Sequence, residues 1–226
     1  MIDTRMGREV RAAIEAARSS ALDARALDDL GRSGRGEVAT EVALHPSWAE
    51  VASLPAHLRE RLGVGRADLD EAAARARADG RWAELVAVSA AWGYGRSSYG
   101  SWRTARITTL PEVAERLAAT VEVLDVEGPV AAYYRLVNEG HLHGWGPASF
   151  TRFLAAADLR GAGRAVMLTP AIAAAVNGLL VLDEIAVADW PTVDYAFHHA
   201  LTHRIAAECG LDVTVVENAW ETMSRP

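Results

Sequence analysis

The stretch that decides the fold is GHLHGWGPASFTRFLAA, residues 140–156. It places a turn with the tripeptide GWG between two segments with helical periodicity. Pro147 suits the first position of the second helix, and Gly144 and Gly146 are free to adopt positive φ and allow a close backbone approach. The sequence therefore predicts two helices joined by a short glycine-rich turn over residues 128–157.

The start of the second helix in this hairpin is suited to bind an anion. Its first backbone N–H groups lack acceptors within the helix, the helix dipole is positive at this end, and glycine places no Cβ in the way. A DNA phosphate fits such a turn without a charged side chain. The alternative is a plain pair of antiparallel helices with a glycine-rich connection.

Helical spacing and capping residues predict an all-α fold. Thr169 and Pro170 mark the start of one helix, and Asn177 with Gly178 is predicted to end it. The segment WGYGRSSYGSWR, residues 92–103, lacks helical periodicity and is predicted to be an ordered loop. The predicted helices cover residues 3–30, 45–62 (as short pieces), 68–78, 81–91, 110–124, 128–140, 147–157, 169–178, 191–209 and 213–223.

The N-terminal part of the chain is predicted to be separate from the rest. The 226 residues are enough for one substantial domain or two small lobes. Residues 31–37, GRSGRGE, are rich in glycine and break the helical pattern. We therefore expect residues 1–40 to form a helix and a linker ahead of a domain over residues 41–226.

The charge of the chain is unevenly distributed. The net charge of −7 argues against indiscriminate binding to nucleic acid. However, residues 92–111 contain three arginines and no acid, and residues 140–165 contain three arginines and two histidines against one acid, Asp158. The sequence therefore predicts a local basic face on an acidic protein.

Several classes of protein are excluded by what the sequence lacks. There is no apolar run near 18 residues, and the N-terminal stretch is charged throughout, so we expect a cytoplasmic protein with no membrane partner. The single Cys209 excludes an internal disulfide, and His199 and His203 lack an acidic third ligand nearby, so we expect no metal and no cofactor. The chain contains no lysine, so no side-chain amine can form a Schiff base.

The sequence LHGWGPASFTRFLAAA, residues 142–157, resembles the helix-hairpin-helix element of the DNA glycosylase superfamily. More closely, it resembles bacterial proteins with the 8-oxoguanine DNA glycosylase fold, whose hairpin reads approximately G-h-G-P-x-F-F-T-K-F-L-Y-F-A, with h apolar. The stretches WGYGRSSYG, VAAYYRLVNEG and WPTVDYAFHHALTHRIAAECGLD match further segments of those proteins in the same order. The resemblance spans roughly residues 80–220 and implies an all-α, two-lobed, helix-hairpin-helix DNA glycosylase-like fold.

The resemblance implies a protein that binds double-stranded DNA, kinks it and extrudes one nucleotide into a cleft. In some superfamily members a lysine near the hairpin attacks the sugar and also cuts the strand. Here Ala148 and Arg152 stand at the positions of that lysine, and arginine is no nucleophile. If active, the protein is expected to be a monofunctional hydrolase of the N-glycosidic bond of a damaged or modified base. The alternative is an inactive relative that serves as a DNA- or protein-binding module.

Two residues compete for the position of the aspartate that stabilises the sugar cation in such enzymes. Thr169 lies 23 residues after Gly146, which is near the usual spacing, but it is not an acid. Asp183, in the string LLVLDEIAVA, matches the local sequence of the relatives but lies 37 residues after Gly146. The spacing favours Thr169, and Asp183 is the candidate catalytic acid only if residues 170–182 are an insertion.

Further residues are candidates for contact with DNA. Trp145 is predicted either to insert between stacked bases or to stack on an exposed base. The alternative is that it packs the tip of the hairpin on the neighbouring helix. Arg152 either reaches a phosphate or lies on a solvated helix face. The predicted DNA-binding residues are His143, Gly144, Trp145, Gly146, Ser149 and Arg152. The predicted base pocket is formed by Trp92, Tyr94, Arg96 and Tyr99, with Trp102 beside them, and the alternative is that these residues anchor a loop on the core.

Overall fold

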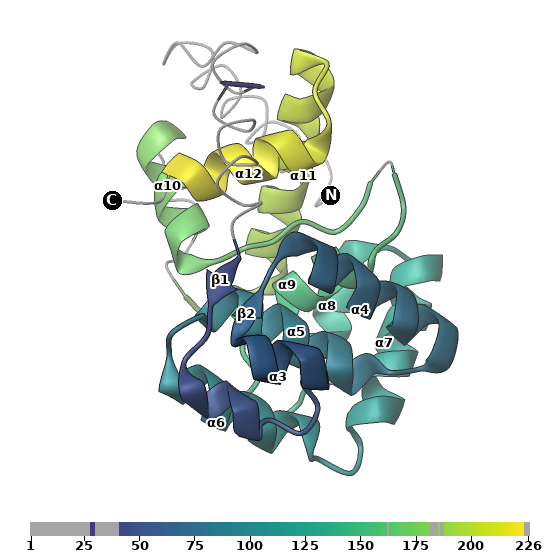
Figure 1. The fold of residues 1–226 in the computed structure, drawn as a ribbon. Helices are drawn as coiled ribbons and strands as arrows, with labels where there is room; N and C mark the ends of the chain where they lie inside the picture. The colour runs from purple at the N-terminus through teal and green to yellow at the C-terminus, as the bar shows by residue number, and fades with distance from the viewer. Residues whose placement is uncertain (1–27, 30–40, 162, 181–184, 186–187, 224–226) are drawn as a thin grey trace. The chain divides into compact units, whose positions relative to one another are not determined.

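A computed structural model of the chain describes residues 28–29, 41–161, 163–180, 185 and 188–223. Within these residues the regular secondary structure is almost entirely helical, so the prediction of an all-α fold is confirmed (Figure 1). Two short strands, β1 (Val42–Ala43) and β2 (Gly63–Val64), pair antiparallel. The helices are η1 (Pro46–Glu50, a 3-10 helix), α3 (Ala56–Arg61), α4 (Arg66–Asp79), α5 (Trp82–Tyr94), α6 (Ser98–Thr108), α7 (Val113–Val126), α8 (Pro129–Val137), α9 (Pro147–Ala157), α10 (Pro170–Leu180), α11 (Thr192–Cys209) and α12 (Val213–Met223).

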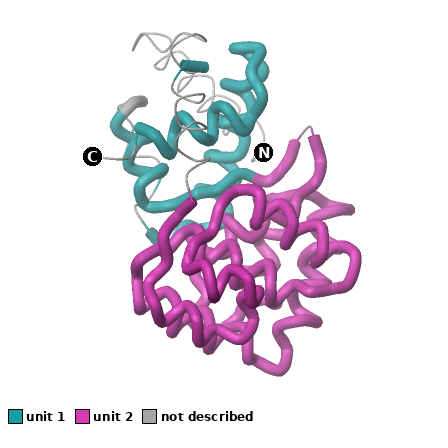
Figure 2. Tube along the Cα trace, in the orientation of Figure 1, with its two compact units in different colours: residues 1–37, 166–226 teal, residues 38–165 magenta. Residues whose placement is uncertain are grey.

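The chain divides into two compact units, which Figure 2 shows in different colours. Unit 2 comprises Val38–Ala165 and contains every element from β1 to α9. Unit 1 comprises Val166–Pro226 together with Met1–Glu37, and it contains α10, α11 and α12. The predicted N-terminal helix and linker lie outside the described residues, except for Asp28 and Asp29. A domain boundary after residue 40 therefore stays a prediction.

Helix α5 is the buried centre of unit 2. Most of its side chains are small or apolar, and Leu85, Val88 and Ala91 are completely buried. The helix contacts α4, α6, α7 and α9. A helix that is apolar around most of its circumference is stable only when neighbours cover it on several sides. Helix α5 therefore holds α6 and α9, which carry the candidate functional residues.

The prediction of an ordered loop over residues 92–103 is wrong. Helix α5 continues through Tyr94, and Ser97 caps α6 by accepting a hydrogen bond from the backbone N–H of Gly100 at 3.2 Å. Gly100 is buried, and a Cβ at this position would lie 2.4 Å from the Cβ of Tyr94. Glycine and serine therefore serve a close contact and a helix cap here, although both residues usually favour loops.

The predicted end of α10 at Asn177 and Gly178 is also wrong, because the helix continues to Leu180. The side chain of Asn177 pairs with the backbone of Ile185 instead of ending the helix. Its Nδ2 donates to the Ile185 carbonyl at 2.7 Å, and its Oδ1 accepts from the Ile185 N–H at 3.3 Å. An amide side chain offers both a hydrogen-bond donor and an acceptor, so the Asn177 side chain satisfies both backbone polar groups of Ile185.

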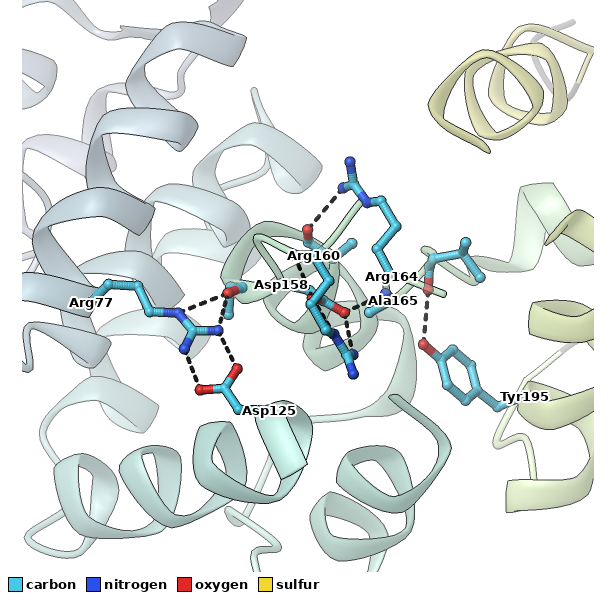
Figure 3. Close-up of polar contacts among 10 residues, drawn as sticks. Arg77, Asp125, Asp158, Arg160, Arg164, Ala165 and Tyr195 are labelled. Atoms are coloured by element: carbon cyan, nitrogen blue, oxygen red, sulfur yellow. Dashed lines mark hydrogen bonds and ion pairs between the residues drawn. The ribbon is translucent and has the colours of Figure 1, made fainter. Parts of the chain in front are cut away.

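The chain that leaves α9 folds around the buried carboxylate of Asp158 (Figure 3). Arg160 donates to this carboxylate from Nε at 2.8 Å and from Nη2 at 2.6 Å, and the backbone N–H groups of Arg160 and Ala165 donate at 3.1 Å and 2.6 Å. Burial alone raises the pKa of Asp158, but these hydrogen bonds and the charge of Arg160 outweigh it, so the pKa is lowered. Asp158 is therefore a structural anion.

Two arginines bind the last carbonyls of α9 (Figure 3). Arg77 of α4 donates to the Ala157 carbonyl from Nε at 3.0 Å and from Nη2 at 2.6 Å, and it also pairs with Asp125 of α7. Arg164 donates from Nη2 to the Ala155 carbonyl at 3.0 Å. Cations stabilise the C-terminal end of a helix because its unpaired carbonyls carry partial negative charge. The C-terminal end of α9 thus has defined partners in unit 2.

Asp158→Asn is expected to lower the free energy of unfolding by about 2–3 kcal/mol, because it removes the carboxylate charge that pairs with Arg160 and disrupts a buried set of hydrogen bonds. Asp125→Asn is the control, since the Asp125 side chain is 44% exposed. Its loss should be below about 1 kcal/mol. Urea denaturation followed by circular dichroism measures both variants. Equal losses in the two variants would contradict the assignment of Asp158.

Candidate nucleic-acid interface

The turn between α8 and α9 contains one glycine in a left-handed conformation. Gly144 has φ +82°, and a Cβ at this position would point into open space. This φ favours glycine, as predicted. Gly146 has φ −90° and ψ 171° as the N-cap residue of α9, so Gly146 does not use the freedom of glycine to adopt positive φ. The residue before a helix adopts an extended conformation, which any side chain tolerates.

The turn presents backbone N–H groups that have no acceptor within the described residues. Some of its donors are used: Trp145 donates to the Leu142 carbonyl at 3.0 Å, and Ser149 and Phe150 donate to the Gly146 carbonyl at 3.0 and 3.1 Å. The first turn of α9 is positively polarised because its amides point outward along the helix axis. Unused donors at this end favour an anion. They belong to His143, Gly144, Gly146 and Ala148.

Arg103 of α6 reaches the same turn. Its Nε donates a hydrogen bond to the Gly144 carbonyl, and its Nη2 would lie 3.7 Å from a Cβ at Gly146. No carboxylate forms an ion pair with Arg103 within the described part of the chain. The set of DNA-binding residues predicted from the sequence omits Arg103. The available signal was the absence of acids from residues 92–111, but only the fold places this arginine at the hairpin.

The indole of Trp145 packs beneath the turn. Trp145 is 4% exposed, and its ring meets the rings of Phe150 and Phe153 edge to face, with centroids 5.8 and 5.4 Å away. Such aromatic contacts add to the stability gained from burial. The structure thus favours the packing alternative for Trp145. A large indole stands between two glycines because it anchors the turn while the glycines shape the backbone around it.

Ser149 and Arg152 face α5 rather than open solvent. Ser149 is buried, and its Oγ lies 3.2 Å from the hydroxyl of Tyr94. Arg152 is half-buried and donates from Nη1 to the Ala148 carbonyl at 3.3 Å. Its guanidinium lies so close to Gly93 that a Cβ there would be 2.6 Å from Nη1. His143 and Gly144, by contrast, are exposed at the turn.

The residues predicted to line a base pocket differ in exposure. Trp92 is 9% exposed within α5, Tyr94 is half-buried, and Arg96 and Tyr99 are exposed. The hydroxyl of Tyr94 contacts the hairpin through Ser149, whereas Tyr99 lies on α6. A base pocket lined by these residues stays a prediction.

Thr169 caps α10, as predicted. Its Oγ1 accepts a hydrogen bond from the backbone N–H of Ile172 at 3.2 Å, and the residue is 6% exposed. This bond satisfies one of the unpaired donors at the start of the helix. Asp183 lies outside the described residues. The choice between Thr169 and Asp183 for the position of the catalytic acid therefore stays open.

The segment before Thr169 is held by buried side chains of unit 1. It belongs to no helix or strand within the described residues, so side chains satisfy its polar groups. The contacts run from Tyr195 Oη to the Val166 carbonyl at 3.2 Å (Figure 3), from His198 Nε2 to the Met167 carbonyl at 2.9 Å, and from the Met167 N–H to the Glu217 carboxylate. Helices α11 and α12 thus fix the approach to the cap of α10.

His198 is a neutral, completely buried histidine. Burial lowers its pKa to about 4. The hydrogen bond to the Met167 carbonyl opposes this change, and the nearby His199 and His203 add to it. The Nδ1 atom of His198 has no hydrogen-bond partner within the described residues. The rings of His199 and His203 lie 4.4 Å apart between centroids.

Two further observations concern the described part of the chain only. It holds no group of three or more His, Cys, Asp and Glu side chains arranged to bind a metal ion. None of its helices combines the length and the apolar character that crossing a membrane requires.

Comparison with known proteins gives a match to one family model, described as "Putative 8-oxoguanine DNA glycosylase OGG-like protein", over residues 35–220. The match covers the helices from α3 through α11 and most of α12, so it includes the hairpin, Thr169 and Asp183. Comparison with curated proteins and with solved structures gives no match.

The free energy of unfolding is expected to fall as the pH is lowered from about 6.5 towards 4. The pKa of His198 is about 4 in the folded state and about 6.5 in the unfolded chain, so protonation in this range favours unfolding. The contribution of neutral His198 to the free energy of unfolding is fully present above about pH 6.5 and amounts to about 3 kcal/mol.

Urea denaturation at a series of pH values measures this effect. His198→Gln should reduce the pH dependence between pH 6.5 and 4, and His141→Gln, at an exposed position, is the control. An unchanged pH profile in His198→Gln would show that other groups cause the dependence.

Proposed function

Because this chain belongs to the family of OGG-like 8-oxoguanine DNA glycosylase proteins, we propose that it binds double-stranded DNA through the hairpin of α8 and α9. We assign this hairpin to the helix-hairpin-helix class. The observation that carries the proposal is the turn at the start of α9, where four backbone N–H groups have no acceptor within the described residues. A phosphate of the DNA backbone supplies the acceptor oxygens that such a turn favours.

Each residue of the proposed interface has a role that follows from its exposure. His143 and Gly144 contact the DNA backbone because they are exposed at the turn, and Arg103 adds positive charge beside them. Trp145 is buried, so it supports the turn from below. Ser149 and Arg152 join the hairpin to α5 and set the orientation in which the turn meets DNA.

The reaction that we propose for an active protein is hydrolysis of the N-glycosidic bond of a damaged or modified base that has been extruded from the duplex. The bond between C1′ of the sugar and the base breaks, and its electron pair leaves with the base while the sugar develops positive charge. Water then adds to C1′ and loses a proton, and the departing base takes up a proton in exchange. Because the chain has no lysine, no imine forms between a side chain and the sugar. The product is an abasic site in an intact strand.

The charge that stabilises the sugar cation decides between an enzyme and a binding protein. Asp183 supplies a carboxylate if it occupies the position of the catalytic acid. Thr169 supplies only a hydroxyl, and that hydroxyl already caps α10. This bond favours the second candidate function, in which the protein recognises damaged or modified DNA without hydrolysing it.

Gly144→Ala is expected to weaken binding to duplex DNA about tenfold, because a Cβ at φ +82° forces the turn to change and misaligns its N–H donors. Gly80→Ala is the matched control. Gly80 caps α4 at φ +70° with open space around its Cβ position, so it carries similar backbone strain at a site outside the hairpin. Fluorescence anisotropy with a labelled duplex measures the affinity, and urea denaturation measures the stability.

Gly146→Val tests the affinity for duplex DNA without adding backbone strain. Its φ of −90° accepts a β-branched side chain, so stability should change little while the side chain blocks access to the N–H groups. Equal affinity for duplex DNA in wild type, Gly144→Ala and Gly146→Val, with all three folded, would remove the hairpin from the DNA interface.

Substitution of the two candidate residues tests catalysis. If Asp183 is the acid, Asp183→Asn should abolish base release while DNA binding survives. If Thr169 holds that position, the wild type should release bases very slowly, and Thr169→Asp should increase the rate, since aspartate caps a helix as well as threonine. Release is measured as abasic sites in duplexes that carry 8-oxoguanine, alkylated bases or other modified bases. Rapid release that depends on Asp183 and is unaffected by Thr169→Asp would exclude the binding-only function.

A further inference from the structure

Helix α6, which Figure 1 labels, carries a pair of exposed aromatic side chains. Tyr99 and Trp102 are three residues apart on one face of the helix, and each is 55% exposed. Their ring centroids lie 5.8 Å apart with an angle of 31° between the rings. Exposing two large rings side by side gives up the stability that their burial provides. The pair therefore indicates a binding surface.

Two arginines flank this aromatic pair. The Cζ atom of Arg103 lies 5.8 Å from the centroid of the Tyr99 ring, and the Cζ atom of Arg106 lies 5.1 Å from the centroid of the Trp102 ring. Cation and ring attract each other through the negative face of the ring. The result is a continuous row on α6, in the order Arg103, Tyr99, Trp102, Arg106, which we call the α6 face.

The positive charge of the α6 face is not neutralised by acids. Helix α6 contains no acidic residue, and within the described residues neither Arg103 nor Arg106 forms an ion pair with a carboxylate. Elsewhere in unit 2 arginines do pair with acids, as Arg75 does with Glu84 and Arg135 with Glu139. On a chain with a net charge of −7, this leaves a local site for an anionic ligand.

We propose that the α6 face binds unpaired nucleotides of single-stranded DNA. The rings of Tyr99 and Trp102 stack on bases, and the guanidinium groups of Arg103 and Arg106 bind the flanking phosphates. Neither feature alone selects this ligand, because an acidic peptide needs the arginines but not two exposed rings. Two exposed rings flanked by guanidinium groups that form no ion pair with a carboxylate within the described residues match a strand that offers both flat bases and phosphates.

Arg103 joins the α6 face to the hairpin. Its guanidinium interacts with the ring of Tyr99 and donates to the carbonyl of Gly144 in the turn. A DNA molecule held by its phosphates at the turn therefore has the α6 face beside it, where nucleotides that have lost their pairing partners can stack. This placement rests on the proposed function, but binding of single-stranded DNA by the α6 face is tested independently of the hairpin and of catalysis.

The test measures the affinity of the full chain for a short oligothymidylate and for an intact duplex by fluorescence anisotropy. Trp102→Ala should weaken binding to the oligothymidylate at least about fivefold, because one base loses its stacking partner. Binding to the intact duplex, whose bases are paired, should change less than about twofold. Trp102→Phe should restore part of the affinity for the single strand. Tyr134→Ala on α8 is the matched control, since Tyr134 is 56% exposed and lies outside the α6 face.

Two outcomes overturn the proposal. One is an oligothymidylate affinity that is unchanged in Trp102→Ala or equally reduced in Tyr134→Ala. The other is a polyglutamate peptide that binds as tightly as the oligothymidylate and responds equally to Trp102→Ala, which assigns the face to an acidic protein. Gly144→Ala distinguishes the two proposals: failure of the hairpin leaves duplex affinity unchanged in that variant, whereas failure of the α6 face leaves single-strand affinity unchanged in Trp102→Ala.

Discussion

The packing of α9 against α5 is the constraint on which the candidate interface depends. Trp82 of α5 and Phe153 of α9 meet edge to face, and the guanidinium of Arg152 lies directly on Gly93 of α5. Asp158 closes the other end of the helix with hydrogen bonds to the chain that follows. A larger residue at position 93 would displace Arg152, so the close packing of α5 and α9 restricts their relative orientation. The turn before α9 therefore presents its donors in one orientation.

The absence of lysine makes arginine the source of every side-chain positive charge apart from histidine. Guanidinium groups pair with carboxylates on the helix surfaces, bind the last carbonyls of α9 through Arg77, and lie over the rings of Tyr99 and Trp102 on α6. A planar group with five donors suits all three settings. An acidic protein thereby keeps a basic surface beside the hairpin, because acids neutralise several arginines elsewhere in unit 2 but, within the described residues, none on α6.

Binding and catalysis make different demands on this chain. Binding needs unused N–H donors and positive charge, and both are present at the turn and on α6. Hydrolysis also needs a fixed negative charge at the sugar. The Thr169 hydroxyl is committed to the cap of α10, and the segment before it is tied to His198 and Glu217. These hydrogen bonds suit a residue whose role is to position α10. A protein that only recognises DNA needs no catalytic role for Thr169.

The sequence by itself determined the helical class, the hairpin and most helix ends, because periodicity, proline at the first helical position and N-cap residues act locally. Helix α9 begins and ends where these signals predict. Only the tertiary structure decided what depends on distant partners. Gly100 and Ser97 belong to a helix because Tyr94 packs against α6, and Asn177 continues α10 because its amide pairs with Ile185. For the same reason the sequence did not show that the Trp145 indole is buried or that Arg103 reaches the hairpin turn: both depend on contacts between helices, which no local pattern encodes.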